Sequence, residues 1–221
     1  MTARLQAARP IAPSTSHFVF EAVDWDARFV PGQFLSFTAT INGAEITRAY
    51  SIASAPDPAT RTFALCANLV EDGRFTPYLF SLQPGDEIGF KGPYGGFIPR
   101  QPFADAIFVA TGTGIAPFRS MLHGLPPDRR VTLIFGTRHH EGLLYDEELR
   151  GLADYRPTLT RPPADWAGLT GRVQPHVLEA LGDRRDLDVY ICGLREMVDD
   201  LRAQLKAAGL DRKRIIYEKY D

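Results

Sequence analysis

The sequence predicts two domains of different architecture. An antiparallel β-barrel is expected over residues 1–100, followed by a doubly wound α/β domain with a parallel sheet over residues 101–221. Three observations predict this division. The length of 221 residues suits one or two domains at about 150 residues each. The first part has short strands separated by turn residues, and the second part alternates apolar strands with helices. We expect the boundary near Arg100 to Phe103.

Short strands dominate the first part. They are expected at His17–Ala22, Phe34–Ile41, Tyr50–Ala53, Thr62–Val70 and Glu87–Phe90. Turn signals such as Asn42-Gly43 separate them, and a short helix is expected to start at Tyr78-Leu79. Closely spaced strands with Gly, Pro, Asn and Asp between them are typical of a small antiparallel barrel or sandwich.

Strands and helices alternate in the second part. The expected strands are Ala106–Ala110, Val131–Phe135, Val189–Cys192 and Ile215–Glu218. The expected helices are Ala116–His123, Leu144–Leu152 and Glu196–Ala208. This alternation indicates a mostly parallel sheet with helices on both faces.

Composition excludes several classes of function. With 25 Lys+Arg against 27 Asp+Glu the formal charge is −2, so no general basic field attracts nucleic acid or an anionic membrane. No apolar run approaches the roughly 18 residues that span a bilayer, and the N-terminal residues lack a signal-peptide core. We therefore expect a cytoplasmic monomer that binds neither nucleic acid nor membranes.

The two cysteines, Cys66 and Cys192, are far apart in sequence. They indicate no disulfide framework, and they are too few for a four-cysteine iron–sulfur cluster within this chain. His139 and His140 are adjacent, which does not place both on one helix face, and a solvated loop is expected there. No metal site is expected.

A strand–turn–helix stands at the start of the second domain. Thr111-Gly112-Thr113-Gly114-Ile115-Ala116-Pro117 follows the apolar strand and precedes the expected helix. This is where a dinucleotide phosphate loop occurs in α/β folds. The spacing is not G-x-G-x-x-G, so by itself the segment predicts either a nucleotide loop or a tight turn.

Three further motifs carry residue types that suit a cofactor. Arg48-Ala49-Tyr50-Ser51, expected at the start of a strand, offers an arginine for a diphosphate and an aromatic ring for a flat cofactor. Gly73-Arg74-Phe75-Thr76 precedes the expected short helix and suits a phosphate. Cys192-Gly193 ends a buried strand at the ligand-binding edge of α/β folds. Taken singly, the three motifs also have ordinary explanations, namely strand packing, a helix cap and a small buried apolar side chain.

The motifs are more informative together. The chain contains, in one fixed order, P-G-Q-F, R-A-Y-S-I-A-S, G-R-F-T, G-P-Y-G-G-F, T-G-T-G-I-A-P and Y-I-C-G. This set resembles the ferredoxin–NADP reductase superfamily, and most closely its bacterial ferredoxin/flavodoxin reductases, along nearly the whole chain. The resemblance implies that the front barrel binds FAD and that the back domain binds a nicotinamide dinucleotide.

The resemblance also implies roles for particular residues. Arg48 is expected to hold the FAD diphosphate, Tyr50 to pack on the isoalloxazine ring, and Ser51 to point toward flavin N5. The other residues expected at FAD are Ala49, Cys66, Ala67, Asn68, Leu69, Gly73, Arg74, Phe75 and Thr76. Those expected at the nicotinamide dinucleotide are Thr111, Gly112, Thr113, Gly114, Pro117, Cys192 and Gly193. Cys192 is expected near the nicotinamide ring.

The chain ends in Tyr217-Glu218-Lys219-Tyr220-Asp221, which resembles the family's plant-type ending. Tyr220 is then expected to cover the flavin face that nicotinamide must reach, and Glu218 to lie near Ser51. Asp221 departs from the pattern because it follows the usual terminal aromatic residue. The implied catalytic residues are Ser51, Cys192, Glu218 and Tyr220, in a site that orients two rings and excludes water during hydride transfer.

Arginines bear on which nicotinamide is used, because NADPH carries an additional 2′-phosphate. Arg138, Arg161 and Arg172 stand where bacterial NADPH-dependent members have arginines, and no acidic residue directly ends the strand at Phe135. NADH-using relatives carry some of these arginines as well. We expect NADPH rather than NADH.

The resulting hypothesis is an FAD-dependent oxidoreductase that exchanges electrons between NADPH and a ferredoxin or flavodoxin, or another iron–sulfur acceptor. One alternative is the NADH-dependent reductase component of an oxygenase system, or a free-flavin reductase. Another is a flavin- or nucleotide-binding module that senses redox state without turnover. The presence of Ser51, Cys192 and Glu218 argues against that last alternative.

Overall fold

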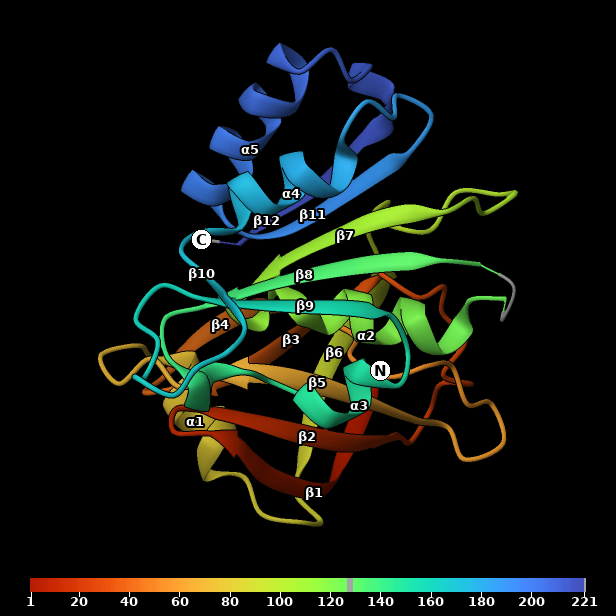
Figure 1. Cartoon of the computed structure of the whole chain (residues 1–221). Coiled ribbons are helices and arrows are strands. Elements are labelled where there is room, and N and C mark those ends of the chain that lie inside the picture. Colours follow the sequence, from red (N-terminus) through yellow and green to blue (C-terminus); the bar gives the residue numbers. More distant parts are fainter. Residues whose placement is uncertain (127–128, 221) are drawn as a thin grey trace. The chain divides into compact units, whose positions relative to one another are not determined.

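A computed structural model describes residues 1–126 and 129–220 (Figure 1). The chain divides into two compact units. The first consists of Met1–Ile98 together with Arg119–Gly124. The second consists of Pro99–Phe118 together with the chain from Leu125 onward. Among the described residues, none of the helices combines the length and the apolar composition that crossing a bilayer requires.

The first unit is an antiparallel six-stranded sheet in the order β4-β3-β6-β1-β2-β5. Its strands are β1 (Thr2–Ala12), β2 (Thr15–Ala22), β3 (Phe34–Ile41), β4 (Ala44–Ser51), β5 (Thr62–Asn68) and β6 (Glu87–Tyr94). A short helix, α1 (Phe75–Ser81), lies between β5 and β6. An antiparallel bridge between Ile52 and Leu65 connects the chain just after β4 to β5. This bridge joins the two ends of the sheet, so the predicted barrel is confirmed.

Aromatic side chains fill the barrel interior. Phe20, Phe37, Phe63 and Phe90 are at most 2% exposed, and their ring centroids lie 5.5 to 6.2 Å apart in several pairs. Strand residues alternate between this interior and the outside, as the burial pattern of β3 shows. The interior is therefore packed with side chains, and ligand contacts are expected from the outer face of the strands, their ends and the loops.

The second unit is a parallel six-stranded sheet in the order β10-β9-β8-β7-β11-β12. Its strands are β7 (Ala106–Thr111), β8 (Val131–Thr137), β9 (Asp154–Leu159), β10 (Leu169–Thr170), β11 (Asp188–Leu194) and β12 (Ile215–Tyr220). Its helices are α3 (Asp146–Arg150), α4 (Val173–Leu181) and α5 (Arg195–Ala207), together with the first residues of α2 (Ile115–Gly124). This arrangement confirms the predicted α/β class.

Alternate side chains of the central strands pack on opposite faces of the sheet. Ile107, Val109, Val189 and Ile191 form one hydrophobic cluster with the buried sides of α4 and α5. Phe108 and Tyr190 lie between them in sequence, and their rings contact each other at 5.3 Å. Figure 1 shows α4 and α5 over one face of this sheet, with α3 on the other. Helices on both faces are what buried parallel strands require.

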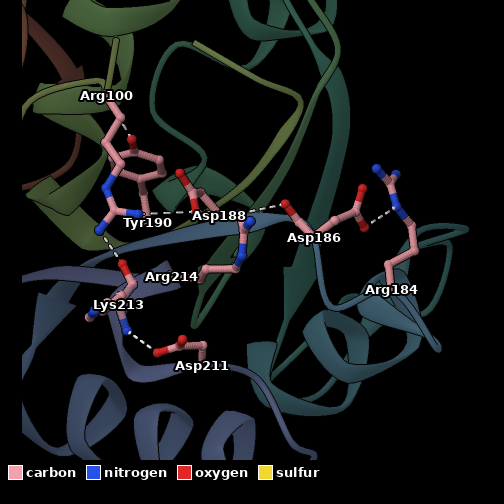
Figure 2. A network of polar contacts seen from close by, with 8 residues as sticks. All are labelled: Arg100, Arg184, Asp186, Asp188, Tyr190, Asp211, Lys213 and Arg214. Carbon is pink, nitrogen blue, oxygen red and sulfur yellow. Dashed lines mark hydrogen bonds and ion pairs between the residues drawn. The ribbon is translucent and has the colours of Figure 1, made fainter. Parts of the chain in front are cut away.

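A polar network ties the start of the second unit to its last two strands (Figure 2). Asp188 lies 3.3 Å from Arg100 and 3.1 Å from Arg214. The Arg100 backbone N–H donates to the Tyr190 hydroxyl at 2.9 Å, and its guanidinium donates to the Lys213 carbonyl. Asp188 and Tyr190 lie in the first half of β11, and Lys213 and Arg214 lie just before β12, so the network anchors the chain at Arg100.

The structure corrects several predicted details. The R-A-Y-S segment lies at the end of β4 rather than at the start of a strand, because Asn42-Gly43 forms a turn that lets the chain pair back onto β3 from Ala44 onward. Helix α1 begins at Phe75 rather than at Tyr78, since the burial of the Phe75 ring secures its first turn. Helix α3 is shorter than Leu144–Leu152, because Tyr145 has a left-handed backbone (φ 58°). Strands β1, β9 and β10 and helix α4 were not predicted.

Candidate functional site

The end of β4 presents the first group of predicted residues. Arg48 and Ala49 are exposed, Tyr50 is half-buried and Ser51 is 6% exposed. The Tyr50 ring lies 6.0 Å from Phe75 and 6.1 Å from Phe37. Burial raises the pKa of the Tyr50 phenol to about 12, with Arg48 opposing the shift. A neutral aromatic ring therefore stands beside an exposed guanidinium.

The end of β5 and the start of α1 present the second group. Cys66 and Ala67 are buried, whereas Asn68 is exposed and its side-chain oxygen accepts a hydrogen bond from Thr15 at 3.1 Å. The Thr76 hydroxyl lies 3.0 Å from the Val70 nitrogen and 3.2 Å from the Val70 carbonyl oxygen. These contacts close the loop of residues 70–76, which follows Leu69 and carries Gly73 and Arg74.

Gly73 sits tightly in that loop, since a Cβ there would lie 2.9 Å from the Val70 carbonyl oxygen. Arg74 is exposed and reaches the Ile41 carbonyl at 3.4 Å. Because Phe75, the first residue of α1, contacts Tyr50, the structure brings the two predicted flavin-binding segments together within the first unit. These segments fit a flavin with a diphosphate. The exposed Arg48 and Arg74 suit the diphosphate, and the half-buried Tyr50 ring suits the flat flavin ring.

The sequence did not predict a role in this region for two residues of α2. Arg119 and Ser120, on α2, bond to the backbone carbonyls of Ala53 and Ser54. They support the chain directly after Ser51. The local sequence holds no signal for this contact, because the partners are 66 residues apart.

In the second unit, the T-G-T-G loop packs against the end of β11. A Cβ on Gly114 would come within 3 Å of the Cys192 carbonyl group and of the Gly193 Cα. A Cβ on Gly193, which has φ +150°, would collide with the Thr111 hydroxyl. The Leu194 nitrogen donates to that hydroxyl at 3.4 Å. Both glycines are thus required for the two segments to meet.

Gly112 has the opposite property. It is exposed with φ +54°, and a Cβ there would meet nothing within 4 Å. Thr113 is half-buried, and Pro117 is buried in the first turn of α2. The loop therefore offers open backbone at the carboxyl end of β7, directly before a helix N-terminus. These are the features that fit the diphosphate of a dinucleotide.

Cys192, Glu218 and Tyr220 lie together at the end of β11 and β12. Cys192 pairs with Glu218 across the two strands, and Leu194 pairs with Tyr220. Burial raises the pKa of the Cys192 thiol well above its usual value, the Glu218 charge raises it further, and a hydrogen bond with the Tyr220 side chain opposes both. The Cys192 side chain is therefore a neutral thiol. Ser51 belongs to the first unit and these three residues to the second, so the expected proximity of Glu218 to Ser51 stays a prediction.

Arg138 and Arg161 are neighbours at the ends of β8 and β9. The Arg161 backbone N–H donates to the Arg138 carbonyl at 2.8 Å, and both residues are exposed. Arg172 precedes α4, and its side chain lies 3.4 Å from Glu196 on α5. The structure thus brings two of the three predicted arginines together and shows an ion pair at the third. His139 and His140 are exposed, and Asp221 lies outside the described residues.

This combination of a closed barrel and a parallel-sheet dinucleotide fold defines a class of flavin-dependent, nicotinamide-dependent oxidoreductases. Residues 2–98 match the oxidoreductase FAD-binding domain, and residues 108–203 match the oxidoreductase NAD-binding domain. The chain is 39% identical to ferredoxin–NADP reductase B of Sorangium cellulosum, over 99% of this chain and 97% of that protein. It therefore belongs to the ferredoxin–NADP reductase family and is an oxidoreductase with FAD-binding and NAD(P)-binding domains.

Structural comparison agrees with this assignment. A crystal structure of a ferredoxin–NADP⁺ reductase from Neisseria gonorrhoeae with bound FAD and NADP has a TM-score of 0.82 and 26% identity, and the match covers 100% of this chain and 97% of that one. Other relatives are longer. The electron transfer component of 2-halobenzoate 1,2-dioxygenase from Burkholderia cepacia is 32% identical over 87% of this chain, which spans 59% of that protein.

Proposed function

We propose that this protein is a cytoplasmic, monomeric NADPH-dependent ferredoxin or flavodoxin reductase. FAD is held by residues 1–100 and the nicotinamide dinucleotide by residues 101–221. The observation that carries the proposal is the close packing of the Gly112–Gly114 loop against Cys192 and Gly193. This packing places open phosphate-binding backbone beside a buried neutral thiol at the ligand edge of the sheet. The relative named ferredoxin–NADP reductase B, which aligns over nearly the whole of both chains, supports it.

The residues of the first unit bind and orient the flavin. Arg48, Arg74 and Thr76 hold its diphosphate. Tyr50 packs on the isoalloxazine as a neutral ring, because its pKa of about 12 keeps the phenol protonated. The buried Ser51 hydroxyl would contact the flavin near N5. Further contacts come from Ala49, Cys66, Ala67, Asn68, Leu69, Gly73 and Phe75.

The residues of the second unit bind the nicotinamide dinucleotide and exclude water. Thr111, Gly112, Thr113, Gly114 and Pro117 form the phosphate loop, with Gly193 allowing its close approach to β11. Cys192 presents a protonated thiol to the nicotinamide ring, so it contributes contact rather than a charge. The two bound groups would supply the hydride-transfer chemistry. Tyr220 would cover the flavin face and act as a gate. Glu218, which pairs with Cys192 in the sheet, would help to set the proton and charge balance near Ser51.

NADPH is the proposed nicotinamide. The adjacent Arg138 and Arg161 are exposed guanidinium groups at the carboxyl ends of β8 and β9, and arginine forks suit a 2′-phosphate. Arg172 is the third proposed arginine. Its ion pair with Glu196 must open or rearrange before its guanidinium can bind the 2′-phosphate. A reductase that prefers NADH is the second candidate, because a subunit of Na⁺-translocating NADH-quinone reductase from Idiomarina loihiensis is 30% identical over 89% of this chain.

Anaerobic stopped-flow absorbance with the FAD-loaded protein tests the proposal. NADPH is expected to bleach the flavin band at least tenfold faster than NADH at equal concentration, since a charge-assisted bond to phosphate is worth about 1.5–3 kcal/mol. Faster bleaching by NADH supports the oxygenase or free-flavin reductase alternative. Bleaching by neither nicotinamide, in a protein that binds FAD, contradicts catalysis and supports a redox-sensing module.

A further inference from the structure

A charged cluster joins the end of β12 to α5. We call Asp199, Arg202 and Lys219 the β12–α5 clamp. The Lys219 ammonium lies 2.7 and 2.9 Å from the two carboxylate oxygens of Asp199, and the Arg202 guanidinium lies 3.2 Å from the same carboxylate. The Lys219 and Arg202 side chains are 23% and 22% exposed, whereas the Asp199 side chain is 48% exposed. The two cations of the clamp are thus partly shielded from water, and its carboxylate is half exposed.

An aromatic side chain of β12 joins the same cluster. The guanidinium carbon of Arg202 lies 3.6 Å from the centroid of the Tyr217 ring, and the Lys219 ammonium lies 5.8 Å from it. A cation over an aromatic face is attracted by the ring quadrupole. Tyr217 and Lys219, two residues apart, are therefore both attached to α5.

Strand alternation connects the clamp to the candidate site. Successive side chains of a strand point to opposite faces, so Glu218 and Tyr220 lie on the face away from Tyr217 and Lys219. That face carries the pairing of Glu218 with Cys192 and the hydrogen bond of Tyr220 with Cys192. In addition, β12 is the last strand of its sheet. Its end is therefore aligned by β11 on one side and by the helix over one face.

We propose that Asp199, acting through Lys219, is a positioning residue that fixes Glu218 and Tyr220 over Cys192. This inference rests on the proposed function only for the catalytic meaning of those two residues. Asp199 touches none of the reacting groups. Its contribution is to hold the side chain of Lys219, and so the backbone on either side of it, in one place. The hydrogen bond from Lys219 also keeps the pKa of Asp199 below its usual value, so the carboxylate is charged at neutral pH.

The chain offers a matched control in the next residue of the same helix. Asp200 accepts hydrogen bonds from Gln174 and Gln204, at 2.8 and 3.0 Å, rather than from Lys219. Asp199→Asn and Asp200→Asn remove the same charge from α5. Only the first weakens the clamp. Effects of net charge or of helix stability are therefore expected in both variants, and effects on β12 only in Asp199→Asn.

The first readout is independent of activity. Cys192 in the FAD-loaded protein is alkylated with iodoacetamide and quantified by peptide mass spectrometry, with the buried Cys66 as an internal reference. Asp199→Asn and Lys219→Met are expected to speed modification of Cys192, but not of Cys66, about two- to fivefold, the range that a partly exposed ion pair carries. Lys219→Arg is expected to restore the slow rate. Equal Cys192 rates in Asp199→Asn and Asp200→Asn would overturn the proposal.

The second readout is the rate of flavin reduction at saturating NADPH. Asp199→Asn is expected to lower this rate about two- to fivefold while leaving KM for NADPH unchanged, because the phosphate-binding residues lie elsewhere. A raised KM with an unchanged rate contradicts the positioning role. If the wild-type flavin is reduced by neither nicotinamide, the proposed function fails, and the Cys192 comparison still decides whether the clamp positions this strand.

Discussion

At the scale of single residues, Tyr50 shows how burial prepares a side chain for contact with a flat cofactor. It stands at the end of a strand, half covered by Phe37 and Phe75. Burial disfavours the phenolate, and this effect exceeds the opposite effect of the nearby Arg48 charge. The ring therefore remains neutral and fixed in place.

Tyr50→Phe is expected to change how the FAD-free protein responds to alkali. Because the folded pKa of about 12 exceeds the usual tyrosine pKa of 10.0, the contribution of the neutral phenol is complete below pH 10 and is lost as the pH rises toward 12. The loss amounts to about 2–3 kcal/mol. Urea unfolding at pH 8 to 12 should show a smaller alkaline loss in the variant. Parallel curves for the two proteins would contradict this assignment.

Arg138 and Arg161 are each proposed to bind the 2′-phosphate of NADPH, so each can be tested by a single substitution. Arg138→Ala and Arg161→Ala are each expected to raise KM for NADPH about tenfold or more, since each removes a charge-assisted bond to phosphate, and to leave KM for NADH nearly unchanged. Steady-state kinetics with ferricyanide measures both constants. Arg156→Ala is a suitable control, because Arg156 lies within β9, the strand that ends shortly before Arg161, and pairs with Asp154. Equal losses with both nicotinamides would remove the 2′-phosphate assignment.

At the scale of elements, the contact between the loop after β7 and the end of β11 depends on the absence of a side chain. Gly114→Ala places a methyl group against the backbone of Cys192 and Gly193, which cannot move aside cheaply. We expect a loss of about 1–3 kcal/mol in the free energy of unfolding and a higher KM for both nicotinamides.

Urea denaturation and steady-state kinetics check this prediction. Gly151→Ala is the control, because a Cβ there would make only an ordinary contact at 3.5 Å. If Gly114→Ala is as stable as Gly151→Ala, the close approach of the loop to β11 is wrong.

At the scale of the whole molecule, each compact unit has a hydrophobic cluster of its own. A ligand bound by one unit should therefore protect that unit more than the other. Hydrogen exchange followed by mass spectrometry is expected to show that FAD slows exchange at residues 48–51 and 66–76. Adenosine 2′,5′-bisphosphate is expected to slow exchange at residues 137–138 and 160–161, and AMP to do so more weakly. Protection by AMP equal to that by the bisphosphate would contradict the role of the arginine pair.

Local residue patterns predicted many of the strands and helices of this structure. Apolar runs bounded by turn residues predicted most of the strands, because burial on both faces of a parallel strand leaves a continuous apolar signal. Strand β1 was missed since its middle residues are exposed, and β9 was missed because it contains Asp154, Arg156 and Pro157. Helix α4 was missed because Pro175 stands in its first turn, a position that helices tolerate.

The sequence by itself determined the family, the two-domain fold class and the order of the predicted cofactor-binding segments, because the glycines, the arginines and the aromatic residues of each motif are adjacent in the chain. Only the tertiary structure decided which segments meet. Tyr50 with Phe75, Gly114 with Cys192, Arg138 with Arg161, and Asp199 with Lys219 are contacts between residues distant in sequence. Such contacts follow from strand order and register, which no local pattern of residues encodes.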